Sequence, residues 1–468
     1  MTTPTMLTSL DASFLHLEHE DAPMHVGSVG IFEGEPLRDE RGHVRLDDVR
    51  ALLVARLPLL PRFRQRLQWS PLRQAPPLWV DDPGFDIARH VRLVHLPAPG
   101  DERALRELTA RVHMERLDRH HPLWELILVD GLEHGRVAMI EKLHHALIDG
   151  VSGVDVAAVT LDFTPETPPS ELRLFVPERG PSPLQLLFRD LATTAGDVVH
   201  LATAAASLVQ HRDEVPAATL DGFREMLHAG FAPRSSLNDR IGASRRFEVI
   251  SRSLDEVRQT KTRLGGTVND VVLAAVTRGL HDLTAARGED ADTLKVLVPV
   301  SRRPDDQRGA LGNQVASLFV DLPVGEGDAR ARFDTIHRTM TRLKASHEDD
   351  ASASLLGFAD HLPGAVVAAI SALVHHQPFV NLVVTNVPAS PVPLYLLGAR
   401  LLDVYPVVPL ARNLTVSVGI LSYDSRLTLG LYADGDAFDD LDVFVSGIDA
   451  GFAELADLAG LTARSRAG

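Results

Sequence analysis

The chain has 468 residues, more than one hydrophobic core usually organises, so we expect two domains or two tightly fused halves. Apolar residues make up 45% of the sequence, which indicates a folded globular protein and excludes a largely disordered one. The formal net charge of −16 argues against nucleic-acid binding, which needs clustered Lys and Arg. The absence of cysteine excludes disulfides, thiolate metal sites and a cysteine nucleophile.

Neither a secretory signal nor a membrane span is expected. Residues 1–21 contain no Lys or Arg, so they lack the positive region that opens a signal peptide. Residues 361–399 contain no charged side chain, but a Pro-Gly pair at 363–364 and a His-His-Gln-Pro run at 375–378 interrupt them. A spanning helix needs about 20 consecutive apolar residues, so we expect a buried helix at 365–374 followed by a buried strand.

The first section of the chain mixes strands with a helix. Apolar runs and alternation predict strands at 24–32, 126–130 and 137–143. Apolar residues at helical spacing predict a helix at 102–116. A short turn at 133–135 joins the last two strands, so part of this sheet is expected to be antiparallel.

The middle of the chain is a proline-rich connector, with six prolines between residues 164 and 183. An Ala-rich pattern of low charge at 184–210 then predicts a long helix, which either packs between the halves or lies on a membrane surface. We therefore divide the chain into a first half at 1–163, a connector with a long helix at 164–244, and a second half at 245–468.

The second half repeats the mixture of strands and helices. The predicted helices lie at 268–286, beginning at Asn269 or Asp270, and at 439–458. The predicted strands are at 246–253, 293–300, 414–422 and 427–432, and the last two form a hairpin around Asp424-Ser425.

The segment His144-His145-Ala-Leu-Ile-Asp149-Gly150 carries the clearest chemistry, because it lies where a predicted strand turns into a predicted helix at 151–161. Adjacent residues at a strand end face opposite ways, so one histidine can enter a given cleft. A histidine with a pKa near 6.5 can take a proton from an alcohol at neutral pH. Asp149 is suited to fixing the turn through an arginine, and Gly150 permits backbone geometry that a Cβ would block.

Other chemistries have weaker support. A metal site of His144, His145 and Asp149 lacks a third histidine at useful spacing, and no HExxH sequence occurs, so we expect no metal. The run 150–154 departs from the GxSxG nucleophile motif because Val154 replaces the second glycine. Neither GxGxxG nor a Walker A sequence is present, and we expect no bound cofactor.

The string HHALIDG resembles the HHxxxDG motif of the CoA-dependent acyltransferase superfamily, which includes chloramphenicol acetyltransferases and the condensation domains of peptide synthetases. The rest of the chain, from about residue 6 to 458, resembles the bacterial wax ester synthase/diacylglycerol acyltransferases. The segments that carry this resemblance follow the family's order: Leu10 to Phe14, Pro23 to Gly27, Pro61 to Leu67, Pro122 to Trp124, Leu237-Asn238, Arg245 to Phe247, Asn269-Asp270, Pro299 to Ser301, Gly312 to Gln314, Asn386 to Pro388 and Leu394-Tyr395.

The resemblance implies an α/β (α+β) fold of two chloramphenicol-acetyltransferase-like mixed-sheet subdomains with an active-site tunnel between them. It implies that His145 is the general base, that His144 supports it, and that Asp149 is structural and held by an arginine. We take Arg64 as the candidate partner of Asp149, because the FRQRL segment is similar to an arginine segment of condensation domains. If Arg64→Ala left the fold and the activity intact, this pairing would be wrong.

Four further residues are candidates for substrate binding or structure. Asn269 and Asp270 either line the tunnel or cap the helix that follows them. Trp124 lies in the strand-like run LWELILV, which favours a core position over contact with an acyl chain. Asn386 belongs to the Asn-Val-Pro motif of the second half.

The resemblance implies an O-acyltransferase that moves a fatty acyl group from acyl-CoA to diacylglycerol, and also to long-chain alcohols, in a ternary complex. Its partners would be acyl-CoA and the lipid alcohol, at the cytoplasmic surface of a membrane or lipid droplet. Two alternatives stay open: a condensation-domain-like enzyme that uses carrier-bound thioesters, and a lipid-binding relative without catalysis. The sequence does not choose between diacylglycerol and a fatty alcohol as acceptor.

Overall fold

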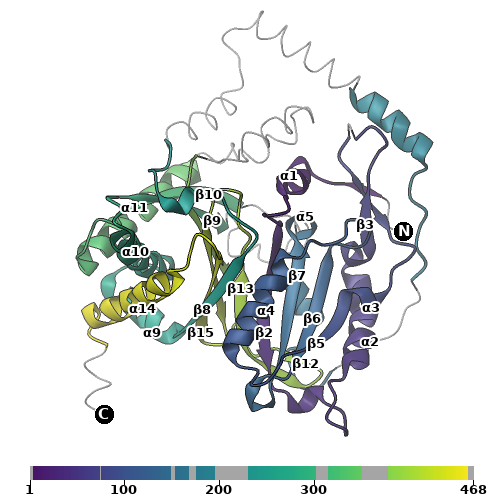
Figure 1. Cartoon of the computed structure of the whole chain (residues 1–468), viewed down its shortest axis with the longest axis horizontal. Coiled ribbons are helices and arrows are strands. Elements are labelled where there is room, and N and C mark those ends of the chain that lie inside the picture. Colours follow the sequence, from purple (N-terminus) through teal and green to yellow (C-terminus); the bar gives the residue numbers. More distant parts are fainter. Residues whose placement is uncertain are drawn as a thin grey trace, which may run out of the picture.

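The computed structural model of the chain describes residues 4–73, 75–148, 153–167, 175–194, 230–301, 315–349 and 378–461. Within them lie two six-stranded sheets, one in each half of the molecule, and a small three-stranded sheet (Figure 1). The strands are β1 (Thr5–Met6), β2 (His25–Phe32), β3 (Gln65–Gln68), β4 (Leu78–Asp81), β5 (Val91–His95), β6 (Trp124–Asp130), β7 (Val137–His144), β8 (Arg245–Ser253), β9 (Leu294–Ser301), β10 (Val315–Leu322), β11 (Leu382–Pro388), β12 (Tyr395–Leu396), β13 (Ala399–Val407), β14 (Val416–Tyr423) and β15 (Arg426–Asp434).

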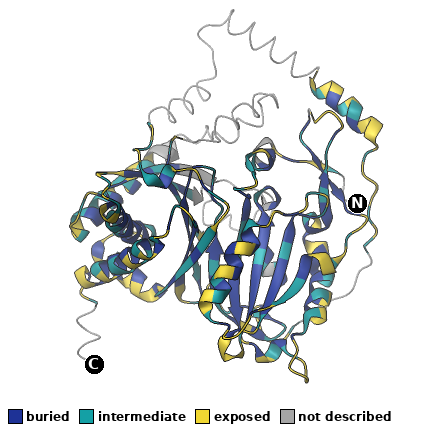
Figure 2. Ribbon diagram, in the orientation of Figure 1, coloured by how far each residue is buried: buried dark blue, intermediate teal, exposed yellow. Residues whose placement is uncertain are grey.

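Helices cover these sheets on the faces where apolar side chains gather, so the sheet interiors are buried (Figure 2). The α-helices for which the structure gives bounds are α1 (Ser9–Leu17), α2 (Leu46–Arg56), α3 (Ile87–His90), α4 (Glu102–Met114), α5 (His145–Ile148), α6 (Gly153–Thr160), α9 (Leu254–Leu264), α10 (Val268–Arg287), α11 (Ala329–Asp349) and α14 (Leu441–Leu458). A further helix spans residues 183–194. Among the described residues, no helix combines the length and apolar character needed to cross a bilayer.

The first sheet has the strand order β12-β13-β2-β7-β6-β5 and has helices on both faces. The helix α4 lies on one face, because Leu105, Leu108 and Val112 recur at helical spacing and are buried between this sheet and β8. The side chain of Asp101 accepts a hydrogen bond from the amide of Ala104 and so begins this helix. The opposite face packs against α2 and α6. The turn at 133–135 joins β6 to β7 as an antiparallel pair, as predicted, whereas β5 and β6 are parallel.

The second sheet has the strand order β10-β9-β11-β14-β15-β8, and the buried faces of α9, α10, α11 and α14 pack on it. The predicted hairpin is confirmed: β14 and β15 are antiparallel, and both turn residues, Asp424 and Ser425, have positive φ. The prediction that Asn269 or Asp270 begins α10 is wrong. Thr267 is the N-cap residue, and Asp270 completes a capping box by accepting the Thr267 amide at 2.8 Å.

The division at residue 245 differs from the observed strand pairing at one place. The strands β12 and β13 come from the second half of the sequence but extend the first sheet, where β13 pairs with β2. This crossing strand passes so close to β15 that a Cβ on Gly430 would lie 1.9 Å from the carbonyl oxygen of Pro406. Residues 395–407 therefore tie the two halves together, an exchange that local patterning does not reveal.

Candidate active site

The two adjacent histidines lie where β7 ends and α5 begins, and their side chains face opposite sides of the chain. His144 is the last residue of β7 and is directly opposite His25 of β2 in the antiparallel register. The amide of His145 donates to the carbonyl oxygen of Met24 at 2.8 Å, which fixes the start of α5. Both histidine positions are thus held by the rigid centre of the first sheet.

His144 faces inward and is 1% exposed. The amide of Ala146 donates to its Nδ1 at 3.0 Å, so the ring proton of neutral His144 lies on Nε2. That Nε2 is 3.5 Å from Oε1 of Glu18, a side chain that is 1% exposed. Burial lowers the pKa of His144, so the ring stays neutral and directs one N–H toward a carboxylate.

Glu18 links this histidine to the guanidinium of Arg119. Its Oε2 accepts hydrogen bonds from Nη2 of Arg119 at 2.6 Å and from Nε at 3.1 Å. Its Oε1 also lies 3.5 Å from Nε2 of His25. Burial alone would raise the pKa of Glu18, but His144 and Arg119 outweigh it and lower that pKa to about 2. Glu18 is therefore a buried carboxylate that stays ionised and orients the group beside it.

His25 fills the remaining side of this cluster without adding charge. Its Nδ1 donates to the carbonyl oxygen of His113 at 3.0 Å, and the amide of Leu117 donates to its Nε2 at 3.4 Å. Burial, with the nearby Lys142 ammonium, lowers the pKa of His25 to about 3. The cluster consequently holds a neutral His25, a neutral His144 and an ionised Glu18.

His145 is half-buried in an apolar setting on the other side of the chain. Its ring stacks on Phe14 of α1, with centroids 3.8 Å apart and planes 23° apart. Burial is the largest cause that lowers the pKa of His145 to about 4, and His144 makes a smaller contribution in the same direction. A neutral imidazole carries one N–H donor and one acceptor nitrogen. The arrangement presents a neutral imidazole that can take a proton.

A second unusual carboxyl lies on the same strand. Glu141 is half-buried on β7, and Ser28 Oγ donates to its Oε2 at 3.1 Å. Burial raises the pKa of Glu141 to about 7. Glu141 is therefore a carboxyl on β7 that is easily protonated, four residues before His145.

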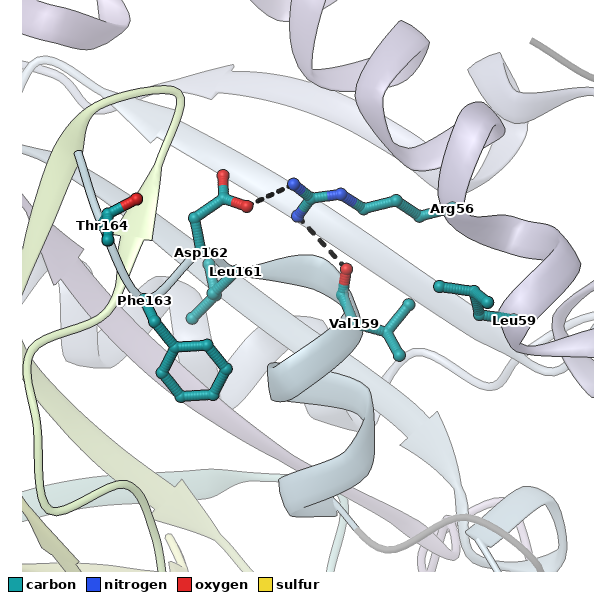
Figure 3. Close-up of a pocket in the computed structure, with 7 residues that line it drawn as sticks. All are labelled: Arg56, Leu59, Val159, Leu161, Asp162, Phe163 and Thr164. Carbon is teal, nitrogen blue, oxygen red and sulfur yellow. Dashed lines mark hydrogen bonds and ion pairs between the residues drawn. The ribbon is translucent and has the colours of Figure 1, made fainter. Parts of the chain in front are cut away.

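The helix that follows the motif is clamped at its far end. Nη1 of Arg56 donates to the carbonyl oxygens of Val159 at 3.2 Å and Thr160 at 3.1 Å, at the C-terminus of α6 (Figure 3). Its Nη2 pairs with Asp162, and both side chains are less than 10% exposed. A guanidinium at this end donates to the last carbonyl groups of the helix, and its positive charge interacts favourably with the negative end of the helix dipole. A pocket of about 370 Å³ opens beside the clamp, where Phe163 points away from Arg56.

Comparisons with known proteins show the family. The catalytic-domain profile of the wax ester synthase/diacylglycerol acyltransferases matches residues 7–272, and the family's C-terminal domain matches residues 311–456. The chain belongs to the wax ester synthase/diacylglycerol acyltransferase family. It is similar to a Mycobacterium tuberculosis protein, tgs1, which is named as a diacylglycerol O-acyltransferase. The two are 33% identical over 465 residues, which cover 96% of this chain and 95% of the relative.

Solved structures agree with this membership. A wax ester synthase/diacylglycerol acyltransferase from Marinobacter aquaeolei VT8 matches with a TM-score of 0.69 and 27% identity, covering 98% of this chain and 100% of the other. The starter condensation domain of rhizomide synthetase RzmA shares the fold alone, with a TM-score of 0.57 and 14% identity over 98% of this chain and 95% of its own. The predicted α/β fold class of two sheet-rich halves is confirmed, and the chain is an acyltransferase.

Two predicted residues of this acyltransferase, Asp149 and Gly150, lie outside the described residues. Arg64, the predicted partner of Asp149, is buried, and its Nη2 donates to the carbonyl oxygen of Val54 at 3.3 Å. Its guanidinium also lies 4.6 Å from the centre of the Phe175 ring. The pairing of Arg64 with Asp149 therefore stays a prediction.

The remaining candidates have other partners among the described residues. Trp124 is 1% exposed, and its Nε1 donates to the carbonyl oxygen of Phe63 at 2.8 Å. Asp270 is buried at the start of α10, where His337 Nδ1 lies 2.8 Å from its Oδ2. Asn269 precedes it and is half-buried, and Asn386 lies on β11 opposite Ile420 of β14. No described contact joins these side chains to His145, so a role in lining the tunnel stays a prediction for Asn269, Asp270 and Asn386.

Sequence reasoning missed Glu18, Phe14, Arg119 and the role of His25. Glu18 and His144 are separated by 126 residues, so no local spacing pairs them. The sequence offered one indication of Glu18, its position between the two segments near the N-terminus that resemble the family, Leu10 to Phe14 and Pro23 to Gly27. Over the described residues, no three His, Asp or Glu side chains are arranged to hold a metal ion.

Proposed function

We propose that this acyltransferase moves a fatty acyl group from acyl-CoA to the hydroxyl of diacylglycerol, and also to long-chain alcohols. The observation that carries the proposal is His145, a neutral, half-buried imidazole that is fixed on Phe14 at the end of β7. Membership in the wax ester synthase/diacylglycerol acyltransferase family and the name of the tgs1 relative support the choice of substrates.

The reaction needs one proton acceptor and no acyl-enzyme. The free nitrogen of His145 takes the proton of the acceptor hydroxyl while that oxygen attacks the thioester carbonyl carbon and forms a C–O bond. Negative charge on the carbonyl oxygen favours the protonated imidazole, which offsets the low pKa of His145 in the free enzyme. The tetrahedral intermediate then breaks its C–S bond, and the CoA sulfur takes the proton from His145. Ester and free CoA leave, which agrees with a chain that has no cysteine.

The cluster behind His145 would hold the base in place. Ionised Glu18 accepts from Arg119 and faces Nε2 of His144, so the residue before the base has little freedom to turn. A base displaced by about 1 Å from the attacking hydroxyl can lose about a hundredfold in rate. His144 and Glu18 are thus proposed as positioning residues and His145 as the catalytic residue.

The substrates also suggest where the enzyme works. Acyl-CoA is proposed as co-substrate without any bound cofactor, and the two substrates would meet in a tunnel between the sheets. Diacylglycerol partitions into lipid, so we propose peripheral binding to the cytoplasmic surface of a membrane or lipid droplet. Association that survives high salt and is lost in detergent would support this location.

A direct assay tests the proposal. Purified protein is given labelled palmitoyl-CoA with diacylglycerol or hexadecanol in parallel, and both CoA release and the labelled ester are measured. We expect ester with at least one acceptor, in a one-to-one ratio with CoA. Failure to release CoA with either acceptor would contradict the assignment and would favour a lipid-binding role without catalysis.

A further inference from the structure

The helix at 183–194 is attached to the small sheet by one face only. Leu186 is 3% exposed and packs on Leu78 and Val80 of β4. Four residues later, Asp190 is fully buried and accepts hydrogen bonds from the Ser70 hydroxyl at 2.5 Å and the Leu72 amide at 2.8 Å. Buried positions four apart fix which side of the helix faces the protein.

The opposite side of this helix carries an apolar stripe. Leu184, Phe188 and Leu191 lie at spacings of four and three, and they are 60%, 63% and 52% exposed. Leu72, on the loop that Asp190 holds, is 50% exposed. The helix lies at the outer edge of the molecule, where exposed and buried residues alternate along it (Figures 1 and 2). Large side chains exposed together at regular spacing mark an interaction surface.

The charges around the stripe select the partner. Arg73 and Arg179 are exposed. Arg189 is half-buried, and its Nη2 donates to the carbonyl oxygen of Pro76 at 3.0 Å. The acid of the helix, Asp190, is buried, and Glu178 is the exposed acid next to Arg179. This local basic excess stands against a net charge of −16 for the whole chain. An apolar stripe with exposed arginines in the adjoining segments complements anionic lipid headgroups. A second copy would bring the same arginines against these.

The stripe is connected to the candidate base through packed aromatic side chains. The loop after Trp69 is the one that Asp190 holds, and Arg73 lies 5.4 Å over the Trp69 ring. That ring meets His16 of α1 edge-on, with centroids 6.3 Å apart. The same helix α1 carries Phe14, on which His145 stacks. A lipid surface against the stripe would therefore adjoin the side of the molecule where α1 covers His145.

We propose that Leu184, Phe188 and Leu191, with the basic residues around them, are the surface by which this enzyme docks on an anionic lipid interface. This proposal rests on the proposed function, because a lipid acceptor requires the enzyme to bind a lipid surface. It adds the part of the molecule that makes this contact. Docking through this surface brings the lipid that contains the acceptor next to α1. The acceptor hydroxyl then reaches His145 without crossing water.

Vesicle flotation of the full-length protein tests the proposal. Vesicles contain phosphatidylcholine with or without phosphatidylglycerol, and the variant combines Leu184→Ser, Phe188→Ser and Leu191→Ser. A matched control places Val392→Ser and Leu458→Ser at apolar residues that are 45% and 46% exposed elsewhere. Ester formation from acyl-CoA and hexanol is measured without vesicles, and the oligomeric state is measured by light scattering.

We expect the wild type and the control to float with phosphatidylglycerol vesicles, and the stripe variant to partition at least about tenfold less. Turnover of hexanol should stay within about twofold in all three proteins, because no substituted residue contacts His145. Equal flotation of the stripe variant and the control would overturn the proposal, as would a wild type that does not float. A dimer that the stripe substitutions dissociate would assign the surface to a second copy instead. Flotation without any ester formation would contradict the proposed function and leave the docking surface standing.

Discussion

Two groups of buried charge lie in the first half of the molecule, and their surroundings differ. Glu18, Arg119 and His144 lie directly behind the half-buried ring of His145. Arg56 and Asp162 lie at the far end of α6 and hold backbone carbonyls. Both groups contain side chains that are less than 10% exposed, so burial alone does not reveal which one serves chemistry. The contacts do, because the first group orients a side chain that can react and the second fixes a helix end.

This difference predicts opposite effects on stability and rate. Substitutions in the Arg56 clamp should lower the free energy of unfolding and leave the rate of the folded enzyme unchanged. Substitutions in the Glu18 cluster should lower the rate in the folded enzyme. Each experiment below tests whether the effects on stability and on rate are separate.

Arg56→Ala should have the largest effect on stability. It leaves the Asp162 carboxylate buried without its partner and frees the last carbonyls of α6, so the free energy of unfolding should fall by about 3–5 kcal/mol. Urea denaturation measures this loss, and kcat of the folded variant should stay within about twofold. Arg103→Ala is the control, since that side chain is 72% exposed and its pairs contribute little. A large fall in kcat without a stability loss would give the clamp a catalytic role.

Glu18→Gln should lower kcat by about tenfold to a hundredfold while KM for acyl-CoA changes little, because the base is displaced and not removed. Steady-state kinetics of ester formation, with folding checked by circular dichroism, separate the two parameters. Glu20→Gln, at an exposed neighbour, should behave as the wild type. An unchanged kcat for Glu18→Gln would remove the positioning role.

The pH dependence of kcat/KM should show the low pKa of His145. The base acts in its neutral form, and its pKa in the folded protein is about 4, below the ordinary 6.5. Activity should therefore persist at pH 5.5 and fall only as the pH drops through about 4. An imidazole with an ordinary pKa would already have lost about nine-tenths of its activity at pH 5.5. An acidic limb near pH 6.5 would contradict the buried, neutral state of His145.

Trp124→Phe should have the smallest effect. It removes the hydrogen bond from Nε1 to the Phe63 carbonyl oxygen and should cost about 1–2 kcal/mol of stability. Because Trp124 is core, the preference among acyl-CoA chain lengths should not change. Competition between palmitoyl-CoA and octanoyl-CoA measures that preference, and a shifted ratio would make Trp124 an acyl contact.

Local patterning predicted the elements that carry the site. The apolar run before His144 became β7, and the turn at 133–135 set its antiparallel pairing. Helical spacing from Glu102 gave α4 to within two residues of its end. Each of these features depends on near neighbours, so the sequence alone was enough.

Features that depend on distant segments could not be predicted this way. The strand β13 joins the first sheet by pairing residues 399–407 with residues 27–32. Nothing in the sequence of either strand indicates its partner. The ionised state of Glu18 depends on Arg119 and His144, which folding brings to it. The N-cap of α10 was misassigned for a local reason, because Thr267, Asn269 and Asp270 are all good capping residues.

The most direct test of the central claim is ester formation by His145→Ala compared with the wild type at saturating acyl-CoA and acceptor. Loss of the general base should lower kcat by about 10²–10⁴-fold. The Tm should change little, because the His145 ring is only half-buried and stacks on Phe14 of α1. A folded His145→Ala enzyme that keeps the wild-type kcat would show that this histidine is not the base.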